Sequence, residues 1–385
     1  MQLGNHMRPS GSYVPASAPD GPKAFVPHPL PPEPLQRLAE GHHGLTGRVN
    51  RALGRLDGLT EMLRERPLLA DLLMHKEALL SLQIGGARAS FVDILLCDGL
   101  DEASAGEVAP VWSFVKAMKH GLGRVREGLP LSLRLIRQMH EIMYAGALEG
   151  RAEAGQFRTA QTWVGGSCPA DAAFTPPPPE NVTECMEALE RFLREDPART
   201  PLLIKAALAH VQFQTIQPFA VGNGHLARML IPLLLCAEGA LPEPLLCLSL
   251  CFKRHGGTYH QLMQRVREES DWAGWIRFFL VGVLEAAEQS AESARSVGEL
   301  FESDRARIQS LGRPAESAFK VHQLLKKSPI ISITTAAREL GLTRPTVAAS
   351  LGHLEALGIV RELTGKARDR RFAYQDYVSI LAEGT

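Results

Sequence analysis

The sequence predicts a mostly α-helical protein with one β-hairpin in its middle and a small α+β module at its C-terminus. Apolar residues recur at helical spacing over most of residues 35–300. Within that region, strand-like alternation is confined to residues 155–164, which run into the turn Gly165-Gly166. After about residue 300, short helices are followed by two strands. A chain of 385 residues is expected to hold two domains, with room for a small third element.

Composition places the chain among ordinary globular proteins. Hydrophobic residues make up 45% and charged residues 22% of the chain. With 42 basic and 42 acidic residues the net charge is zero, so binding to nucleic acid would need a local patch. The longest apolar runs are too short to span a bilayer, and the first 22 residues lack a signal-peptide core. We therefore expect a cytoplasmic protein without membrane association.

The cysteines indicate neither disulfides nor a metal centre. Their spacing is irregular and includes no C-x-x-C pair, so buried, reduced thiols are expected and no metal site is predicted. The six residues are Cys97, Cys168, Cys185, Cys236, Cys247 and Cys251.

The elements follow in order from these patterns. The first 22 residues are polar and expected to be disordered, and residues 23–34 are too proline-rich for helix and should lie extended. Helical spacing covers 35–100, with a break near Pro67, and then most of 104–148, 180–196, 201–237 and 258–300. Pro176–Pro179 is a rigid connector.

The C-terminal pattern is that of a winged helix-turn-helix. Helices are expected at 318–326, 334–340 and 345–357, with Thr343 as the N-cap of the third. Strands at 359–364 and 370–374 flank a basic loop. The predicted divisions are a disordered 1–22, a helical region 23–103, a core 104–300 and the winged module 301–385.

Gly222-Asn223-Gly224 lies between two helical patterns, residues 202–216 and 226–236. Glycines allow close backbone approach, and the following helix aims its unpaired N–H groups and positive dipole end at the same point. Arg228, one turn further, can add a guanidinium. These residues favour a phosphate site, and a plain interhelical turn is the alternative that they leave open.

Residues 217–228 read Gln-Pro-Phe-Ala-Val-Gly-Asn-Gly-His-Leu-Ala-Arg and resemble the Fic (Fido-domain) motif, H-P-F-x-[D/E]-G-N-G-R-x-x-R. Residues 155–166 resemble the flap of that family, and residues 77–86 its inhibitory motif S-x-x-[I/A]-E-G, with Ser81 and Gly85 at the first and fifth positions. The proline-rich start and the winged C-terminus fit a large bacterial subgroup. The resemblance implies a Fido helical core with a β-hairpin flap and a winged helix.

The resemblance also implies an activity, the transfer of AMP from ATP to a hydroxyl of a target protein. The phosphates would be held by the N–H groups of Gly222, Asn223 and Gly224 and by the side chains of His225 and Arg228. The flap residues Val164, Gly165 and Gly166 would close over the nucleotide, and Tyr259 falls where many members contact adenine.

Four positions depart from the family pattern. Gln217 stands at the position of the catalytic histidine, whose action as a general base is worth about 10²–10⁴-fold in rate. Val221 replaces the acid that helps to hold Mg²⁺, which weakens the case for that ion while ATP remains the expected ligand or donor. His225 replaces an arginine, and Gly85 replaces the inhibitory glutamate.

Three hypotheses follow. The first is an impaired or inactive Fic protein that acts by binding a nucleotide or a partner. The second is an enzyme with altered chemistry, in which His225, His210, His255 or His260 supplies a base. The third is a DNA-binding regulator, possible also as a homodimer, that uses the winged helix. Its candidate DNA contacts are Arg344, Thr346, Lys366, Arg368, Arg370 and Arg371.

Overall fold

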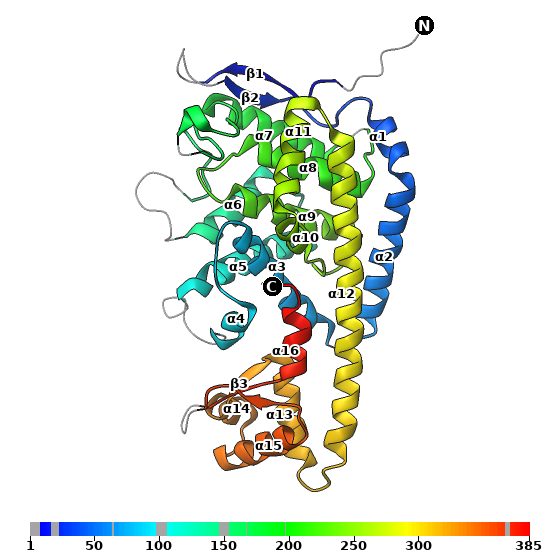
Figure 1. Cartoon of the computed structure of the whole chain (residues 1–385), viewed down its shortest axis with the longest axis vertical. Helices are drawn as coiled ribbons and strands as arrows, with labels where there is room; N and C mark the ends of the chain where they lie inside the picture. The colour runs from blue at the N-terminus through cyan, green and yellow to red at the C-terminus, as the bar shows by residue number, and fades with distance from the viewer. Residues whose placement is uncertain are drawn as a thin grey trace. The chain divides into compact units, whose positions relative to one another are not determined.

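The structure is a computed structural model that describes residues 8–16, 23–63, 65–97, 106–145, 154–166, 168–196, 198–365 and 370–385 (Figure 1). It confirms a mostly helical chain. The chain forms two compact units, one from residues 1–54 and 112–287 and the other from residues 55–111 and 288–385. Each unit is therefore made of two separate stretches of the sequence. The predicted domain boundaries at residues 103 and 300 stay predictions.

Helix α8 is the centre of the first unit. All its residues from Leu203 to Ile216 are buried, as expected for a helix that is apolar on every side. It packs against α9, which is buried from Leu226 to Leu235. The helices that lie within this unit are α1 (Leu35–Gly41), α6 (Leu133–Tyr144), α7 (Pro179–Arg194), α8 (Leu202–Ile216), α9 (Asn223–Ala237), α10 (Leu248–Arg254) and α11 (Gly256–Glu269), with the 3₁₀ turn η3 (Pro169–Asp171).

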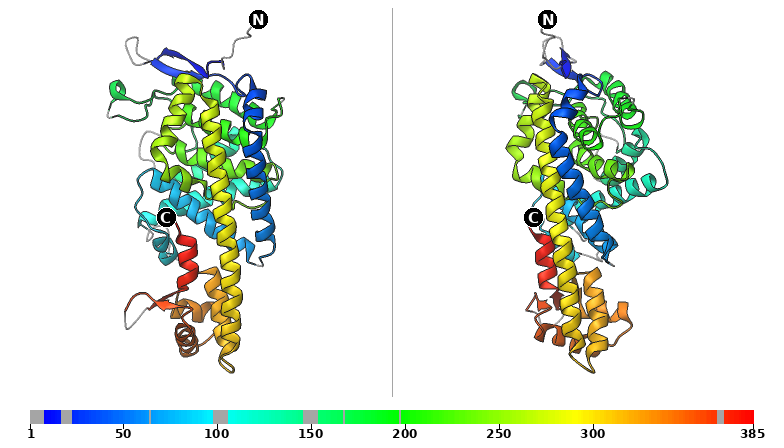
Figure 2. Two further views of the ribbon diagram at one scale, coloured as in Figure 1. Left: turned by 45° about the vertical axis from the view of Figure 1, so that its right-hand side comes forward. Right: turned by 90° about the vertical axis from the view of Figure 1, so that its right-hand side faces the viewer.

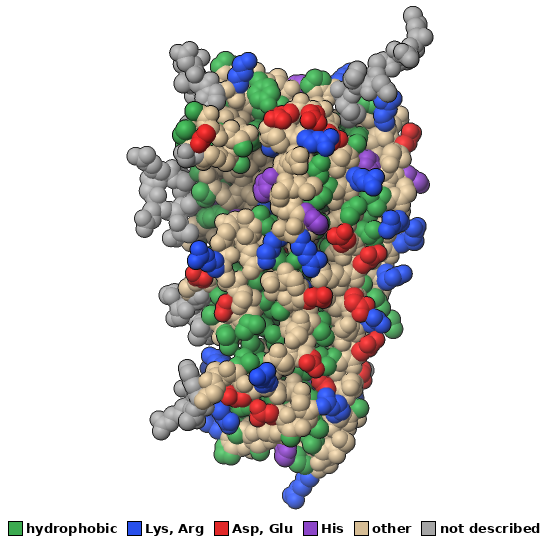
Figure 3. Space-filling model, viewed as in Figure 1, with side chains coloured by type: hydrophobic (Ala, Val, Ile, Leu, Met, Phe, Trp, Pro, Cys, Tyr) green, Lys and Arg blue, Asp and Glu red, His purple; other side chains and the backbone are tan. Residues whose placement is uncertain are grey.

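Three helices carry the chain from one unit to the other. They are α2 (His43–Glu61), α5 (Ala109–Arg126) and α12 (Trp272–Gln309). No helix in the described ranges is long and apolar enough to cross a membrane. On the face drawn in Figure 3, acidic and basic side chains are interspersed, as the zero net charge leads one to expect.

The N-terminal residues correct one prediction. Residues 11–15, expected to be disordered, form strand β1 (Gly11–Pro15), which pairs antiparallel with β2 (Lys23–Pro27). The Tyr13 ring packs edge-to-face with the buried Phe25 ring, with 5.2 Å between the ring centroids. This apolar contact offsets the conformational entropy lost when the strand is ordered. Strand β2 lies against α7 and α8, and both views in Figure 2 show the two strands at the same end of this unit.

The predicted hairpin at residues 155–166 is wrong in its strand content. The described residues form only one antiparallel bridge, between Val164 and Phe174. Further pairing would bring this segment opposite Pro176–Pro179, and proline has no N–H to donate to a ladder. Side chains bridge the gap instead: the Gln161 amide donates to the Pro176 carbonyl at 2.9 Å, and Arg158 donates to the Pro177 carbonyl.

The second unit contains the C-terminal elements in the predicted order, with two additions. A three-stranded antiparallel sheet has the order β3-β5-β4, and β3 and α16 were not predicted from the sequence. Thr343 is the N-cap of α15, accepting from the Thr346 N–H at 3.3 Å as expected. The elements are α3 (Arg66–Ile84), α4 (Phe91–Cys97), η2 (Gly106–Val108), α13 (Ala315–Lys327), β3 (Ile330–Ser332), α14 (Ile333–Leu340), α15 (Arg344–Ala356), β4 (Arg361–Glu362), β5 (Arg371–Ala373) and α16 (Gln375–Ala382).

Candidate active site

The loop between α8 and α9 carries the motif. Gln217 ends α8 in the left-handed region, with φ 48° and ψ 60°, which turns the chain away from the helix. Asn223 then closes the loop with both ends of its amide: Nδ2 donates to the Phe219 carbonyl and Oδ1 accepts from the Phe219 N–H, each at 2.8 Å. The side-chain amide of Asn223 therefore has a structural role in closing the loop.

Gly222 is required by both conformation and space. Its φ is 77°, and a Cβ at this position would lie 2.3 Å from the Tyr144 ring. Helix α9 begins directly afterwards, and helix geometry leaves the N–H groups of Asn223 and Gly224 without an intrahelical acceptor. The Arg228 guanidinium folds back over this turn, since a Cβ on Gly224 would lie 3.1 Å from Arg228 Nη1. A buried guanidinium and a helix N-terminus thus converge, as an anion site requires.

His225 is a neutral partner of Arg228. Its Nδ1 lies 3.2 Å from Arg228 Nη2, and because a guanidinium can only donate, Nδ1 accepts. Burial and the Arg228 charge lower the pKa of His225 to about 3. Position 225 therefore adds no positive charge near neutral pH.

Tyr259 lies in a buried polar network. Its side chain is 1% exposed, and its hydroxyl lies 2.8 Å from His210 Nε2 and accepts from Gln214 Nε2 at 3.0 Å. Arg228 also donates to this hydroxyl. Because His210 Nδ1 faces the Ala227 carbonyl at 3.0 Å, that nitrogen carries the proton and Nε2 accepts from Tyr259.

The Gln217 side chain connects to this network at its outer end. Its Nε2 donates to the carbonyl oxygen of Gln214 at 2.9 Å and to Gln214 Oε1 at 3.1 Å. Both amide hydrogens are thereby used, which leaves Oε1 as the atom that can accept a hydrogen bond from a ligand. An amide oxygen can orient a hydroxyl but cannot take its proton near neutral pH.

Two further residues hold the loop, and neither is predicted from the sequence to have a role. Arg158 donates from Nε to the Gln217 carbonyl at 2.8 Å and from its backbone N–H to the Pro218 carbonyl at 2.9 Å. His140 accepts from the Gly155 N–H at 2.9 Å and, through Nε2, donates to the Val221 carbonyl at 3.2 Å. Arg158 lies within residues 155–166, which resemble the flap, whereas nothing in the sequence around His140 distinguishes it from other helical histidines.

Comparison with known proteins agrees with this geometry. The sequence profile of the Fic/DOC family matches residues 130–235, and that of the Fic/DOC family N-terminal region matches residues 43–123. The chain carries a Fic/DOC domain. The motif loop, α8 and most of α9 all lie inside the matched range of that domain.

Characterised relatives match over part of the chain. Protein adenylyltransferase fic-1 of Caenorhabditis elegans is 33% identical over 113 residues, which is 29% of this chain and 20% of that protein. Protein adenylyltransferase Fic of Drosophila melanogaster is 26% identical over 182 residues, 46% of this chain and 33% of that protein. The matching segments thus span only a fifth to a third of these relatives.

Two solved structures share the fold. A Fic family protein from Desulfovibrio desulfuricans G20 has a TM-score of 0.58 at 17% identity and covers 90% of this chain and 98% of its own. A Fic domain containing signaling protein from Bacteroides thetaiotaomicron VPI-5482 has a TM-score of 0.53 at 16% identity and covers 65% of this chain and 97% of its own. At such identities the likeness establishes the fold alone.

Within the first unit, the structure brings some predicted site residues together. Gly224, His225, Arg228 and Tyr259 form one contiguous cluster at the start of α9. Because the Tyr259 ring is buried and its hydroxyl is taken, an adenine contact stays a prediction. Val164 lies in the single flap bridge.

The flap glycines need their conformation. Gly165 and Gly166 have φ of 71° and 74°, and a Cβ on Gly166 would meet the Asp171 carbonyl oxygen at 2.5 Å. Trp163 and Val164 beside them are 42% and 37% exposed. The flap tip therefore combines a fixed backbone with open apolar side chains, and its closure over a nucleotide stays a prediction.

Other predicted residues belong to the second unit. Ser81 is buried in α3 and Gly85 caps the end of that helix, so their inhibitory relation to Arg228 stays a prediction. Arg344 is exposed at the start of α15, while the Thr346 hydroxyl is engaged with Thr343 at 2.8 Å. Arg370 and Arg371 flank or begin β5, and Lys366 and Arg368 lie outside the described residues.

Proposed function

We propose that the Fic/DOC domain binds the phosphates of ATP at the start of α9 and is impaired in AMP transfer. Support for binding comes from the Asn223 and Gly224 N–H groups and the Arg228 guanidinium that lies over them. The observation that carries the proposal is the side-chain amide of Gln217. It stands beside the expected phosphate site, where an amide cannot act as a general base.

The nearby histidines do not supply the missing base. Burial lowers the pKa of His210 and of His225 to about 3, which argues against the altered-chemistry hypothesis for these two residues. A general base works best with a pKa near the operating pH. His260 Nδ1 donates to the Gly256 carbonyl of its own helix at 2.8 Å, and His255 lies one turn before Tyr259.

Val221 does not provide a ligand for a Mg²⁺ ion held by the protein. Mg²⁺ requires oxygen ligands in near-octahedral geometry. The Val221 side chain offers no oxygen, and its carbonyl already accepts from His140. Any Mg²⁺ would therefore arrive with ATP and be held by the phosphates.

Calorimetric titration of the full chain with ATP, with and without Mg²⁺, tests the binding half of the proposal. We expect saturable binding that survives removal of the metal. Absence of binding under both conditions would contradict the proposal and leave the domain as a scaffold. Strong, metal-dependent labelling of protein by α-labelled ATP would contradict the impairment half instead.

If transfer remains, the relatives' name indicates the acceptor class. They are called protein adenylyltransferases, so a protein hydroxyl would receive AMP from ATP. The identity of the target is a separate question, which labelling of a proteome with tagged ATP would address.

A second candidate function is supported by the C-terminal elements. We propose that helices α13–α15 and the three-stranded sheet form a winged helix that contacts DNA phosphates. Arg344 is exposed at the N-terminus of α15, and Arg370 and Arg371 begin the return strand after the basic loop. Fluorescence anisotropy with a duplex should show affinity that falls as salt rises, because phosphate contacts release counterions.

The loop variant Arg368→Ala/Arg370→Ala/Arg371→Ala tests this second function. Each lost phosphate contact should reduce the slope of log K against log[salt] by about 0.9. A slope unchanged from the parent chain would exclude the wing as a DNA-contacting surface. The matched control is Arg277→Ala, a basic side chain on α12 outside this module.

A further inference from the structure

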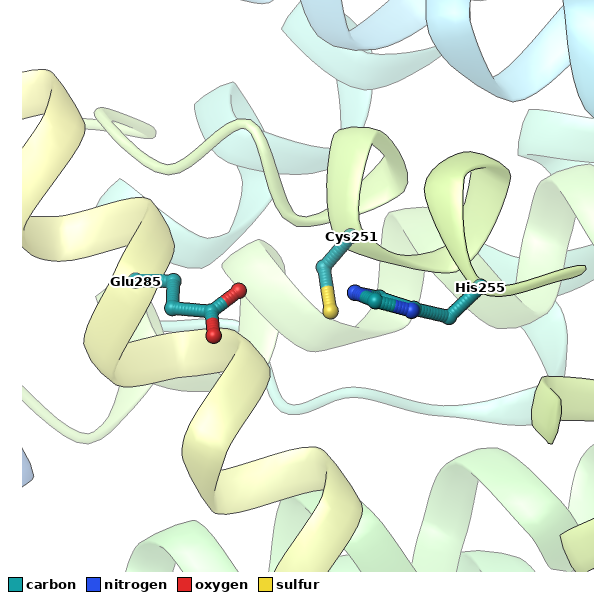
Figure 4. Close-up of side chains that lie close together, drawn as sticks. All are labelled: Cys251, His255 and Glu285. Atoms are coloured by element: carbon teal, nitrogen blue, oxygen red, sulfur yellow. The ribbon is translucent and has the colours of Figure 1, made fainter.

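A cysteine, a histidine and a glutamate converge away from the motif loop. Cys251 on α10, His255 at the C-cap of α10 and Glu285 on α12 each offer one ligand atom, and these atoms lie within 4.8 Å of one another. Figure 4 shows the His255 ring and the Glu285 carboxylate on either side of the Cys251 sulfur. Cys251 and His255 are four residues apart and so lie on one face of the helix.

The close approach of α10 to α12 is built into the sequence. A Cβ on Gly282 would lie 2.9 Å from Cys251 Sγ, so any larger residue would push the thiol away. Gly282 stands one turn before Glu285 on α12. The glycine therefore lets the sulfur lie against α12, within reach of the carboxylate.

The surroundings suit an ion that enters from solvent and is then partly shielded. Cys251 is 7% exposed, while His255 and Glu285 are exposed to solvent. A zinc ion with Zn–S of about 2.3 Å and Zn–N of about 2.0–2.1 Å needs ligand atoms somewhat closer together than 4.8 Å, so the side chains would move closer together on binding.

We propose that Cys251, His255 and Glu285 form a site for Zn²⁺, with water as the fourth ligand. No metal site is predicted from the sequence, because the three residues do not follow a common ligand spacing and one of them comes from another helix. Thiolate and imidazole select zinc over Mg²⁺ and Ca²⁺, which take oxygen ligands. Binding displaces the thiol proton, whose pKa burial and Glu285 raise to about 11.

The site would tie the first unit together next to the phosphate-binding cluster. Phe252, adjacent to Cys251, stacks on the Tyr259 ring at 4.6 Å, and Tyr259 in turn bonds to Arg228. Zinc would join α10 to α12 at the edge of this aromatic layer. Its expected role is to fix the layer that positions Arg228, and it takes no part in transfer.

The test is a titration of the metal-free full chain with Zn²⁺ against a chromophoric chelator, with the chain as purified also analysed for metal content. We expect one high-affinity Zn²⁺ per chain. Loss of an outer-shell partner typically weakens metal affinity about 10–100-fold, so loss of a direct ligand in Cys251→Ser, His255→Ala or Glu285→Gln should weaken it by more than about 100-fold. Co²⁺ loading should give a sulfur-to-cobalt charge-transfer band that disappears in Cys251→Ser.

Matched controls keep the outcome specific. Cys236→Ser, His260→Ala and Glu288→Gln change the same residue types outside the cluster and should retain full affinity. Circular dichroism of each metal-free variant confirms that it is folded. The proposal is overturned if no stoichiometric Zn²⁺ binds, if the Cys251→Ser variant binds as well as the parent chain, or if the cobalt complex lacks the sulfur band.

Discussion

A histidine at position 217 could adopt the backbone conformation of Gln217, but the two side chains differ in basicity. Histidine is among the residues that enter the left-handed region most readily, so the backbone at position 217, with φ of 48°, can accept it. The hydrogen bond to the Gln214 carbonyl could be kept by an imidazole N–H. The obstacle to transfer at this position is therefore chemical, and one substitution can address it.

We predict that Gln217→His combined with Val221→Asp restores transfer. A general base contributes about 10²–10⁴-fold, so labelling by α-labelled ATP should rise by a factor in this range over Val221→Asp alone. Gln217→Asn in the same background is the control, since it preserves the amide and should stay at the background level. A restored motif that remains silent would mean that loss of function extends beyond these two positions.

Arg228 should dominate ATP affinity. Hydrogen bonds to charged groups contribute about 1.5–3 kcal/mol, so Arg228→Lys should weaken ATP binding by about 10–100-fold in calorimetry. Arg254→Ala removes an exposed arginine from the nearby α10 and should leave the affinity unchanged. Equal losses in the two variants would contradict a specific contact between the Arg228 guanidinium and the phosphates.

His140 makes stability depend on pH. Burial lowers its pKa from 6.5 to about 4, so the folded chain favours the neutral ring. This contribution is complete above pH 6.5 and is lost as pH falls towards 4, because the unfolded chain then binds a proton that the folded chain does not. The shift corresponds to about 3 kcal/mol.

Denaturant unfolding at pH 7, 5.5 and 4.5 measures that loss. His140→Gln removes the titrating group, so its stability should fall less between pH 7 and 4.5 than that of the parent chain. His260→Gln, at an exposed position, should follow the parent curve. If His140→Gln also follows the parent curve, the ring is not the source of the pH dependence.

At the scale of elements, the start of α9 depends on the absence of a side chain at position 222. Gly222→Ala should cost about 1–2 kcal/mol for its positive φ and about 1–3 kcal/mol more for overlap with Tyr144. Gly239 provides the comparison, since its φ is 73° and a Cβ there would meet nothing within 4 Å. Gly239→Ala should therefore show the conformational cost alone.

Chemical denaturation of the two alanine variants separates these costs. Adding Tyr144→Ala to each should recover stability in the Gly222→Ala background relative to the Gly239→Ala background. The same loss at both glycines would contradict the close packing of Tyr144 on the loop.

The elements also show what the sequence could and could not predict. Helices α8 and α9 and their connecting loop follow from apolar spacing and Gly-Asn-Gly, and Thr343 follows from capping chemistry. Alternation of apolar and polar residues predicts strand pairing for the flap, but this pattern describes residues 155–164 alone and not the segment that would pair with them. Its partner segment, Pro176–Pro179, cannot donate, and that becomes visible only when the two are brought together.

The candidate site divides in the same way. Gly222, Asn223, Gly224 and Arg228 were predicted because they are close in sequence. His140 and the Cys251 cluster were missed because their partners lie on other helices, at separations that no local pattern encodes. Long-range polar contacts of this kind depend on tertiary packing.

At the scale of the whole molecule, the second unit depends on contacts between distant segments. Lys326 is 6% exposed, pairs with Glu65 at 2.9 Å and lies 4.3 Å above the Phe301 ring. Removing only the carboxylate leaves an ammonium buried without a counter-charge. Glu65→Gln should therefore destabilise the chain by about 2–3 kcal/mol, somewhat less than for a fully buried pair.

The double variant Glu65→Gln/Lys326→Met should recover much of that loss, because it removes the stranded charge. Glu316→Gln, which breaks the exposed pair with Lys320, should change stability by less than about 0.5 kcal/mol. Urea unfolding of all three variants gives the comparison. A double variant no more stable than Glu65→Gln would show that the buried charge is not what costs stability.

The interleaved chain has a consequence for synthesis on the ribosome. Residues 55–111 are translated before residues 112–287, yet the segment that completes their unit, residues 288–385, is translated after them. At about 5–20 residues per second, translation of the intervening stretch takes on the order of 10–35 seconds. During that time the apolar face of α3 has no native partner from the unfinished segment, which makes the nascent chain a natural client for chaperones that shield hydrophobic surface.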